Sequence, residues 1–151
     1  MLEYVKGAEN KIRAIMFSYM DLYEQYPDYS SLVLLQLRVH RGFHTSKAYQ
    51  LVRYPAGLLI RAIQEGIEAG DFRQDVDPYL VRSILLGTLE QIFTRWHLLG
   101  KPAKPPSELD PMLSIIFQGI KAPQPAGDLI LHVRHEYGVK EGKAKKKGNA
   151  T

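Results

Sequence analysis

The sequence predicts an all-α fold, a helical bundle of five to six helices. Through most of the chain apolar residues recur at spacings of three and four, which is the pattern of amphipathic helices. Prolines and glycines divide this pattern into segments of helical length. Strand signals are weak except at residues 129–133, which fit a short strand or a helical turn. With 151 residues, 45% of them hydrophobic, the chain can bury a core as one globular domain.

The first predicted helix spans residues 4–26 and ends at Pro27. A second helix, residues 30–43, is expected to be buried on most sides because few of its positions are polar. Three residues can cap its first turn: Asp28, Ser30 and Ser31.

The third helical stretch covers residues 47–69 and is broken or bent near Pro55, because proline removes a backbone donor and restricts the residue before it. Two consecutive helices and one kinked helix both fit this pattern. Gly70 is placed to take the left-handed conformation that follows a helix, so the stretch should end there.

The last two helices carry the most apolar surface in the chain. Asp77 and Pro78 form a strong start signal, a capping residue followed by proline at the first helical position, and the helix they open runs to Gly100. After a proline-rich loop, the final helix is capped by Ser107 or Asp110 and reaches residue 121. A helix that is apolar on more than one side needs more than one partner surface.

The excess of positive charge lies at the C-terminal end. Residues 1–120 hold 13 basic and 13 acidic side chains, whereas the remaining residues hold 7 and 3. We therefore divide the chain into a helical domain, residues 1–121, and a basic C-terminal segment, residues 122–151, with disorder expected from about Glu141. A neutral domain lacks the footprint of phosphate-backbone binding, although the lysines of the segment could bind phosphates weakly.

The sequence lacks the signals of membrane insertion, export, cysteine chemistry and common catalytic motifs. No run of about 18 apolar residues predicts a membrane span, and the N-terminus is too charged for a signal peptide, so we expect a cytoplasmic protein with no membrane partner. The absence of cysteine excludes disulfides and thiolate metal sites. No nucleotide-binding glycine loop, GxSxG motif or paired-carboxylate site is present, and HVRHE at residues 132–136 departs from metalloprotease motifs. We therefore expect that the protein is not an enzyme and that it binds no cofactor.

Candidate ligand-binding residues occur on two helices. Tyr19, Met20 and Tyr23 could line an apolar pocket, since aromatic and methionine side chains adapt to apolar ligands, or they could simply be core. Glu90 lies in line with Phe93 and His97 on the long helix. A charge in so apolar a helix could pair within the bundle, face a pocket or reach solvent.

His40 and His44 are four residues apart, which places two imidazoles on one helical face. A zinc site needs at least three protein ligands, and no third is evident, so we predict no metal. With Arg41 beside them, these histidines could instead meet an anionic group.

Two runs, IRAIQEGIEAGDFRQDVDPYLVRSILLGTLEQIFTRWHLLGKP and LDPMLSIIFQGI, resemble the second half of TetR-type transcriptional regulators. The likeness covers roughly residues 5–121 and rests on an ordered set of helix ends. It implies the sensing and dimerisation domain of a TetR-type repressor, with a pocket for a largely apolar or amphipathic effector. The alternative is a helical interaction module without an effector. The family's DNA-binding domain is a separate N-terminal three-helix unit that we do not find here, so DNA would be bound only through such a domain.

The resemblance also implies where the ligand and the partner subunit bind. Effector would lie between the first helix, the middle helices and the long fourth helix, and the candidate pocket residues are Tyr19, Met20, Tyr23, Leu37, His40, Arg41, His44, Leu59, Ile63, Glu90, Phe93 and His97. In the family the last two helices of each subunit form an intermolecular four-helix bundle. The candidate residues of this homodimer interface are Ile84, Leu85, Thr88, Leu89, Ile92, Trp96, Met112, Leu113, Ile116, Phe117 and Ile120. Trp96 is expected to be a packing anchor rather than a ligand contact.

Overall fold

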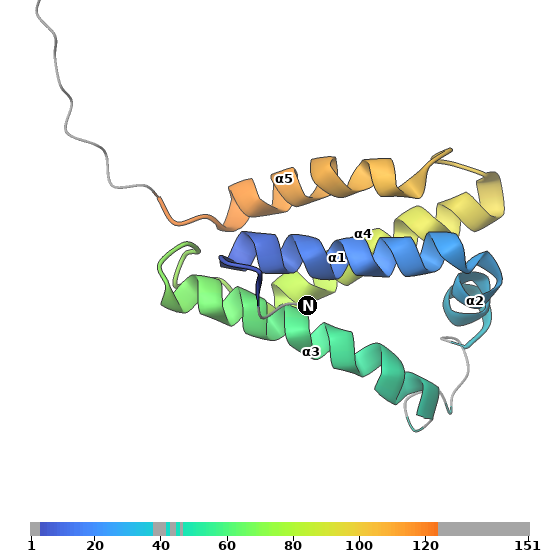
Figure 1. Cartoon of the computed structure of the whole chain (residues 1–151), viewed down its shortest axis with the longest axis horizontal. Helices are drawn as coiled ribbons and strands as arrows, with labels where there is room; N and C mark the ends of the chain where they lie inside the picture. The colour runs from blue at the N-terminus through green and yellow to red at the C-terminus, as the bar shows by residue number, and fades with distance from the viewer. Residues whose placement is uncertain (1–3, 38–41, 43–44, 46, 124–151) are drawn as a thin grey trace, which may run out of the picture.

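The computed structural model describes residues 4–37, 42, 45 and 47–123, and these form an all-α domain (Figure 1). The predicted fold class is confirmed. In chain order the helical elements are α1 (Ala8–Gln25), α2 (Pro27–Ser31), the π-helical turn η2 (Leu32–Gln36), α3 (Lys47–Glu68), α4 (Pro78–Leu99), the 3-10 turn η5 (Pro105–Glu108) and α5 (Leu109–Ile120).

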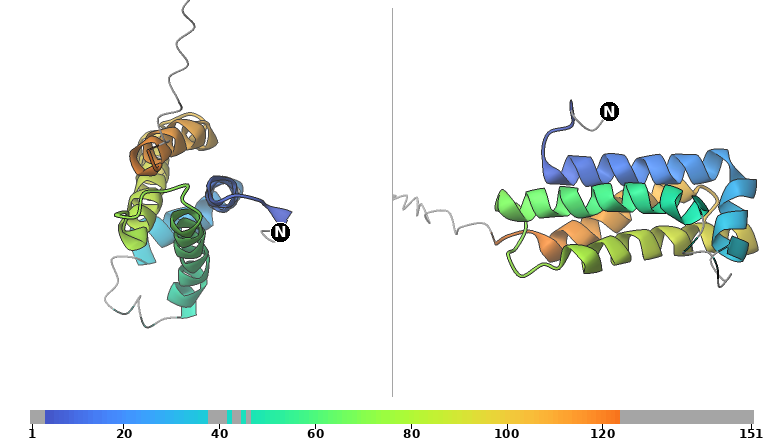
Figure 2. Two further views of the ribbon diagram at one scale, coloured as in Figure 1. Left: turned by 90° about the vertical axis from the view of Figure 1, so that its left-hand side faces the viewer. Right: turned by 90° about the horizontal axis from the view of Figure 1, so that it is seen from below.

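Helix α1 lies between α3 and α5, with α4 behind it, and α2 with η2 crosses one end of the bundle (Figure 1). Seen end on, the four long helices surround a common interior (Figure 2). This interior is filled by apolar side chains that are almost completely buried: Ile12, Met16, Met20, Leu59, Ile63, Phe72, Leu85, Leu89, Phe93 and Leu113. The core therefore belongs to a single chain and draws on every long helix.

The ends of α4 follow the predicted signals. Asp77 caps the helix, since its Oδ1 accepts a hydrogen bond of 2.8 Å from the backbone N–H of Tyr79, and Pro78 takes the first helical position. Gly100 ends the helix with φ at 64°, in the left-handed region that glycine adopts without strain.

At three other places the structure adds to the predicted helix boundaries or differs from them. Pro27 opens α2 as well as closing α1, so the expected caps Asp28, Ser30 and Ser31 lie inside the helical segment. Helix α5 has neither expected cap, because η5 leads directly into it and no side chain bonds its first turn. Helix α3 runs through Pro55 as one helix, and Gly70 follows it with φ at 80°.

The turn between α3 and α4 packs against the ends of α3 and α5 through Phe72. This side chain is fully buried, stacks on Phe117 at 6.3 Å between ring centroids, and lies against Gly66, where a Cβ would come within 2.4 Å of the ring. An antiparallel bridge pairs Phe72 with Lys121, and the N–H of Ala122 donates to the carbonyl of Asp71 at 2.9 Å. The chain after α5 is therefore held beside the end of α3.

Candidate functional site

An apolar groove runs between α1 and α3. Its cavity has a volume of about 280 Å³. We call it the α1–α3 groove, and its lining residues are Ala14, Ile15, Ser18, Tyr19, Leu22, Pro55 and Leu58. Its walls are mostly hydrocarbon, so it suits an apolar group.

The sequence of α1 creates this groove on the flank of its core-facing stripe. Ala14, Ser18 and Leu22 are four residues apart, which places them in one row along the helix. Two of them are small, so space remains beside α3. The Ser18 hydroxyl donates to the carbonyl of Ala14 at 2.9 Å, which satisfies its hydrogen-bonding need within α1.

An aromatic cluster continues from the groove into the bundle. Tyr19 meets Tyr23 edge to face at 6.4 Å between centroids, and Tyr23 meets Phe93 in the same way at 5.3 Å. Phe93 in turn contacts Trp96 at 5.7 Å. Edge-to-face contacts of this kind add stability beyond the area that they bury. Trp96 thus packs against the chain's own cluster.

Next to this cluster, the buried hydroxyl of Ser30 links α2 to α4. Ser30 is fully buried, and its Oγ lies 3.1 Å from the carbonyl oxygens of Tyr23 and Pro27 and 2.8 Å from Nε2 of His97. Carbonyls only accept hydrogen bonds, so the Ser30 hydroxyl shares its one hydrogen between the two carbonyls and accepts a hydrogen bond from Nε2–H of His97. Desolvation by burial lowers the pKa of His97 from its ordinary value of 6.5, which favours the neutral ring.

The predicted ligand-binding residues fall into three groups. Tyr19 lines the α1–α3 groove. Leu37, Glu90 and His97 are partly buried. The rest of the described set lies in the closed core: Met20, Tyr23, Leu59, Ile63 and Phe93.

His40, Arg41 and His44 lie outside the described residues. In the part of the chain that the structure describes, no three His, Asp or Glu side chains are grouped to hold a metal ion. Most of the groove lining is not among the predicted ligand-binding residues, because on α1 those residues belong to the core-facing stripe. The signal that could have found it is the row of Ala14, Ser18 and Leu22 on the neighbouring flank.

A second groove lies between α4 and α5, with a volume of about 550 Å³. This α4–α5 groove includes five of the predicted interface residues: Ile84, Thr88, Ile92, Met112 and Ile116. It also includes Ile115, which is 73% exposed, and it has Arg95 and Glu108 among its lining residues. The other predicted interface residues, apart from Trp96, are buried within the chain's own core: Leu85, Leu89, Leu113, Phe117 and Ile120.

The comparisons give the family. A family model described as "YsiA-like protein, C-terminal region" matches residues 2–116. The chain therefore belongs to this family of TetR-type C-terminal domains.

The solved structure of the transcriptional regulator FadR from Bacillus subtilis, in complex with stearoyl-CoA, has the same fold. The TM-score is 0.70 at 18% sequence identity, and the match covers 79% of this chain and 64% of the FadR chain. The chain thus spans less than two thirds of that regulator's length. No protein with a curated description matches the sequence. Among the described helices, none has the length and hydrophobicity to cross a membrane.

Proposed function

We propose that this chain is the effector-binding and dimerisation domain of a TetR-type repressor, and that its effector carries a long alkyl chain, as in a long-chain acyl-CoA. Residues 1–121 form the sensing domain, and residues 122–151 form a separate segment. The observation that carries the proposal is the α1–α3 groove, an unfilled apolar space on a fold whose solved neighbour contains stearoyl-CoA.

The size and chemistry of the groove favour an alkyl chain. Its volume of about 280 Å³ is near the lower end of small-molecule sites, so it would admit a narrow chain more readily than a large ring system. Met16 and Met20 of α1 are buried in the core, and unbranched methionine side chains can rearrange around an inserted chain. Tyr19 lines the groove and belongs to the aromatic cluster, so its side chain would respond directly to a ligand in the groove.

The α4–α5 groove supports a homodimer. A soluble monomer seldom leaves such an apolar face open, and Ile84 and Ile115 are 46% and 73% exposed on it. In a two-fold dimer the same face of each subunit meets its copy. Effector binding would change the spacing of DNA-binding domains attached to the two subunits, provided that it binds the two conformations with different affinity. Such a repressor would act in the cytoplasm.

Thermal denaturation with acyl-CoAs of increasing chain length tests the effector class. Each added methylene that enters the groove should contribute about 0.8 kcal/mol, so the melting temperature at fixed ligand concentration should rise with chain length until the groove is full. Free coenzyme A is the matched control and should give no comparable rise. A melting temperature unaffected by every chain length would favour the alternative, a helical interaction module without an effector.

A further inference from the structure

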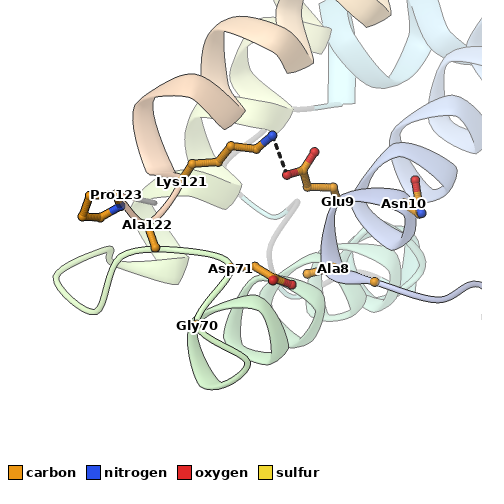
Figure 3. A pocket seen from close by; sticks show the side chains of 9 residues that line it. Ala8, Glu9, Asn10, Gly70, Asp71, Lys121, Ala122 and Pro123 are labelled. Carbon is orange, nitrogen blue, oxygen red and sulfur yellow. Dashed lines mark ion pairs between the residues drawn. The ribbon is translucent and has the colours of Figure 1, made fainter. Parts of the chain in front are cut away.

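The C-terminal segment leaves the domain at one end of the seam between α1 and α3. Lys121 forms an ion pair of 3.0 Å with Glu9 in the first turn of α1, and Ala122 is hydrogen-bonded to Asp71 after the end of α3. Figure 3 shows these residues around one cavity of about 440 Å³, whose walls come from the start of α1, the end of α3 and the end of α5. The C-terminal segment therefore begins at one end of the same two helices that form the α1–α3 groove.

The reach of the segment matches the distance to the groove. From Ala8 to Ala14 and Leu22, α1 advances about 9 Å and 21 Å, at about 1.5 Å per residue. Leu129 is seven residues beyond Ala122, so extended chain at about 3.3 Å per residue can carry it about 23 Å. Apolar residues placed there can enter the groove without any movement of the helices.

The sequence of the segment supplies an apolar stretch at this distance and polar residues beyond it. Residues 129–133 read LILHV, and in extended chain Leu129, Leu131 and Val133 share one side. These three residues span about 13 Å, which is close to the 12 Å that α1 advances from Ala14 to Leu22. The lysine-rich residues 140–151 include no large apolar side chain that could fill a groove.

We propose that residues 129–133 of the same chain dock in the α1–α3 groove and occupy it when effector is absent. The segment is an internal competitor: its attachment beside the groove gives it a high effective concentration, and an alkyl chain binds by displacing it. The docking depends only on the groove and on the position of the segment, whereas the competition with effector rests on the proposed function.

Disulfide trapping tests the docking directly, because the chain contains no cysteine of its own. In Ser18→Cys/Leu131→Cys, the two residues should come within the roughly 7 Å between Cα atoms that a disulfide requires. The control is Ser114→Cys/Leu131→Cys, which has the same C-terminal cysteine but places the other on an exposed position of α5. An internal disulfide that forms at least tenfold faster in the first protein supports the proposal. Equal rates, or covalent dimers in place of the internal loop, would overturn it.

Titration with a fluorescent long-chain fatty acid tests the competition. Leu129→Asp/Leu131→Asp should bind this probe about three- to tenfold more tightly than the unaltered chain, since removal of a competitor that occupies most of the grooves restores the intrinsic affinity. The control, Lys145→Ala/Lys146→Ala, should bind like the unaltered chain. Equal affinity of all three proteins would overturn the competition and leave the proposed function intact. Failure of all three to bind would contradict the proposed function, and the disulfide rates would still decide the docking.

Discussion

Ser30 Oγ lies 2.8 Å from Nε2 of His97, and this contact joins the short helix α2 to the last turn of α4. The serine is fully buried and also bonds the carbonyls of Tyr23 and Pro27. One hydroxyl thus fixes the junction between α1 and α2 against the long helix. The aromatic cluster of Tyr23 and Phe93 lies beside this junction, so its geometry depends on the same contact.

Ser30→Ala should destabilise the domain by about 1–3 kcal/mol, because it leaves buried polar partners without a hydrogen bond. Ser83→Ala is the matched control: the Ser83 hydroxyl also bonds a backbone carbonyl, that of Tyr79 at 2.8 Å, but it is exposed. The control should change stability by no more than about 0.5 kcal/mol. Urea denaturation followed by circular dichroism measures both values, and equal effects would contradict a structural role for Ser30.

Stability should fall as the pH falls through the ordinary pKa of histidine, and His97 should contribute to this fall. Burial lowers the pKa of His97 below 6.5, so below that pH the unfolded chain binds a proton that the folded chain resists. His97→Gln keeps an N–H donor for Ser30 and removes the titration. Its free energy of unfolding should depend less on pH between 7 and 5 than that of the unaltered chain. Identical slopes would show that His97 does not contribute.

Gly66→Ala should destabilise the domain by about 1–3 kcal/mol, because the new methyl group would lie 2.4 Å from the Phe72 ring and 2.8 Å from Cβ of Ala8. Gly119→Ala on α5 has open space around the added Cβ and should be neutral or stabilise by up to about 1 kcal/mol. Thermal denaturation should therefore show a lower melting temperature for Gly66→Ala and an unchanged or higher melting temperature for Gly119→Ala. A Gly66 variant as stable as the control would contradict the close packing of Phe72.

Ile115→Asp should convert the proposed dimer into monomers without unfolding the subunit, since this side chain is 73% exposed in the single chain. Phe17→Asp, at an apolar residue of α1 that is 54% exposed, should leave the dimer intact. Sedimentation velocity distinguishes the two species, and circular dichroism confirms that both variants are folded. Leu89 is unsuitable for this test because it is 1% exposed, so a charge there would disrupt the core.

The helices themselves could be predicted because their signals are local. Asp77, Pro78 and Gly100 act through backbone geometry within a few residues, and the apolar spacing of α1 and α3 identifies their buried sides. The start of α2 was misplaced because proline both ends one helix and opens the next. Pro27 does both here, and whether a helix begins at a proline depends on the chain that follows it.

The candidate site could be predicted only in part. An apolar side chain on a helix can line a groove or fill the core, and the pattern of one helix does not separate these outcomes. Tyr19 lies at the boundary between them, whereas Met20 and Tyr23 are closed into the core. The groove also needs Pro55 and Leu58 from α3, and their position beside α1 is a property of the packed bundle.

Native mass spectrometry of the purified chain with stearoyl-CoA shows whether the α1–α3 groove binds an acyl chain. We predict one ligand per chain on the unaltered protein, and loss of that ligand in Ala14→Phe, where a phenyl ring fills the α1–α3 groove. Gln64→Phe, which adds the same ring at an exposed position of α3, should bind like the unaltered chain. Absence of any bound ligand, or equal binding by Ala14→Phe, would contradict the assignment of this groove as the effector site.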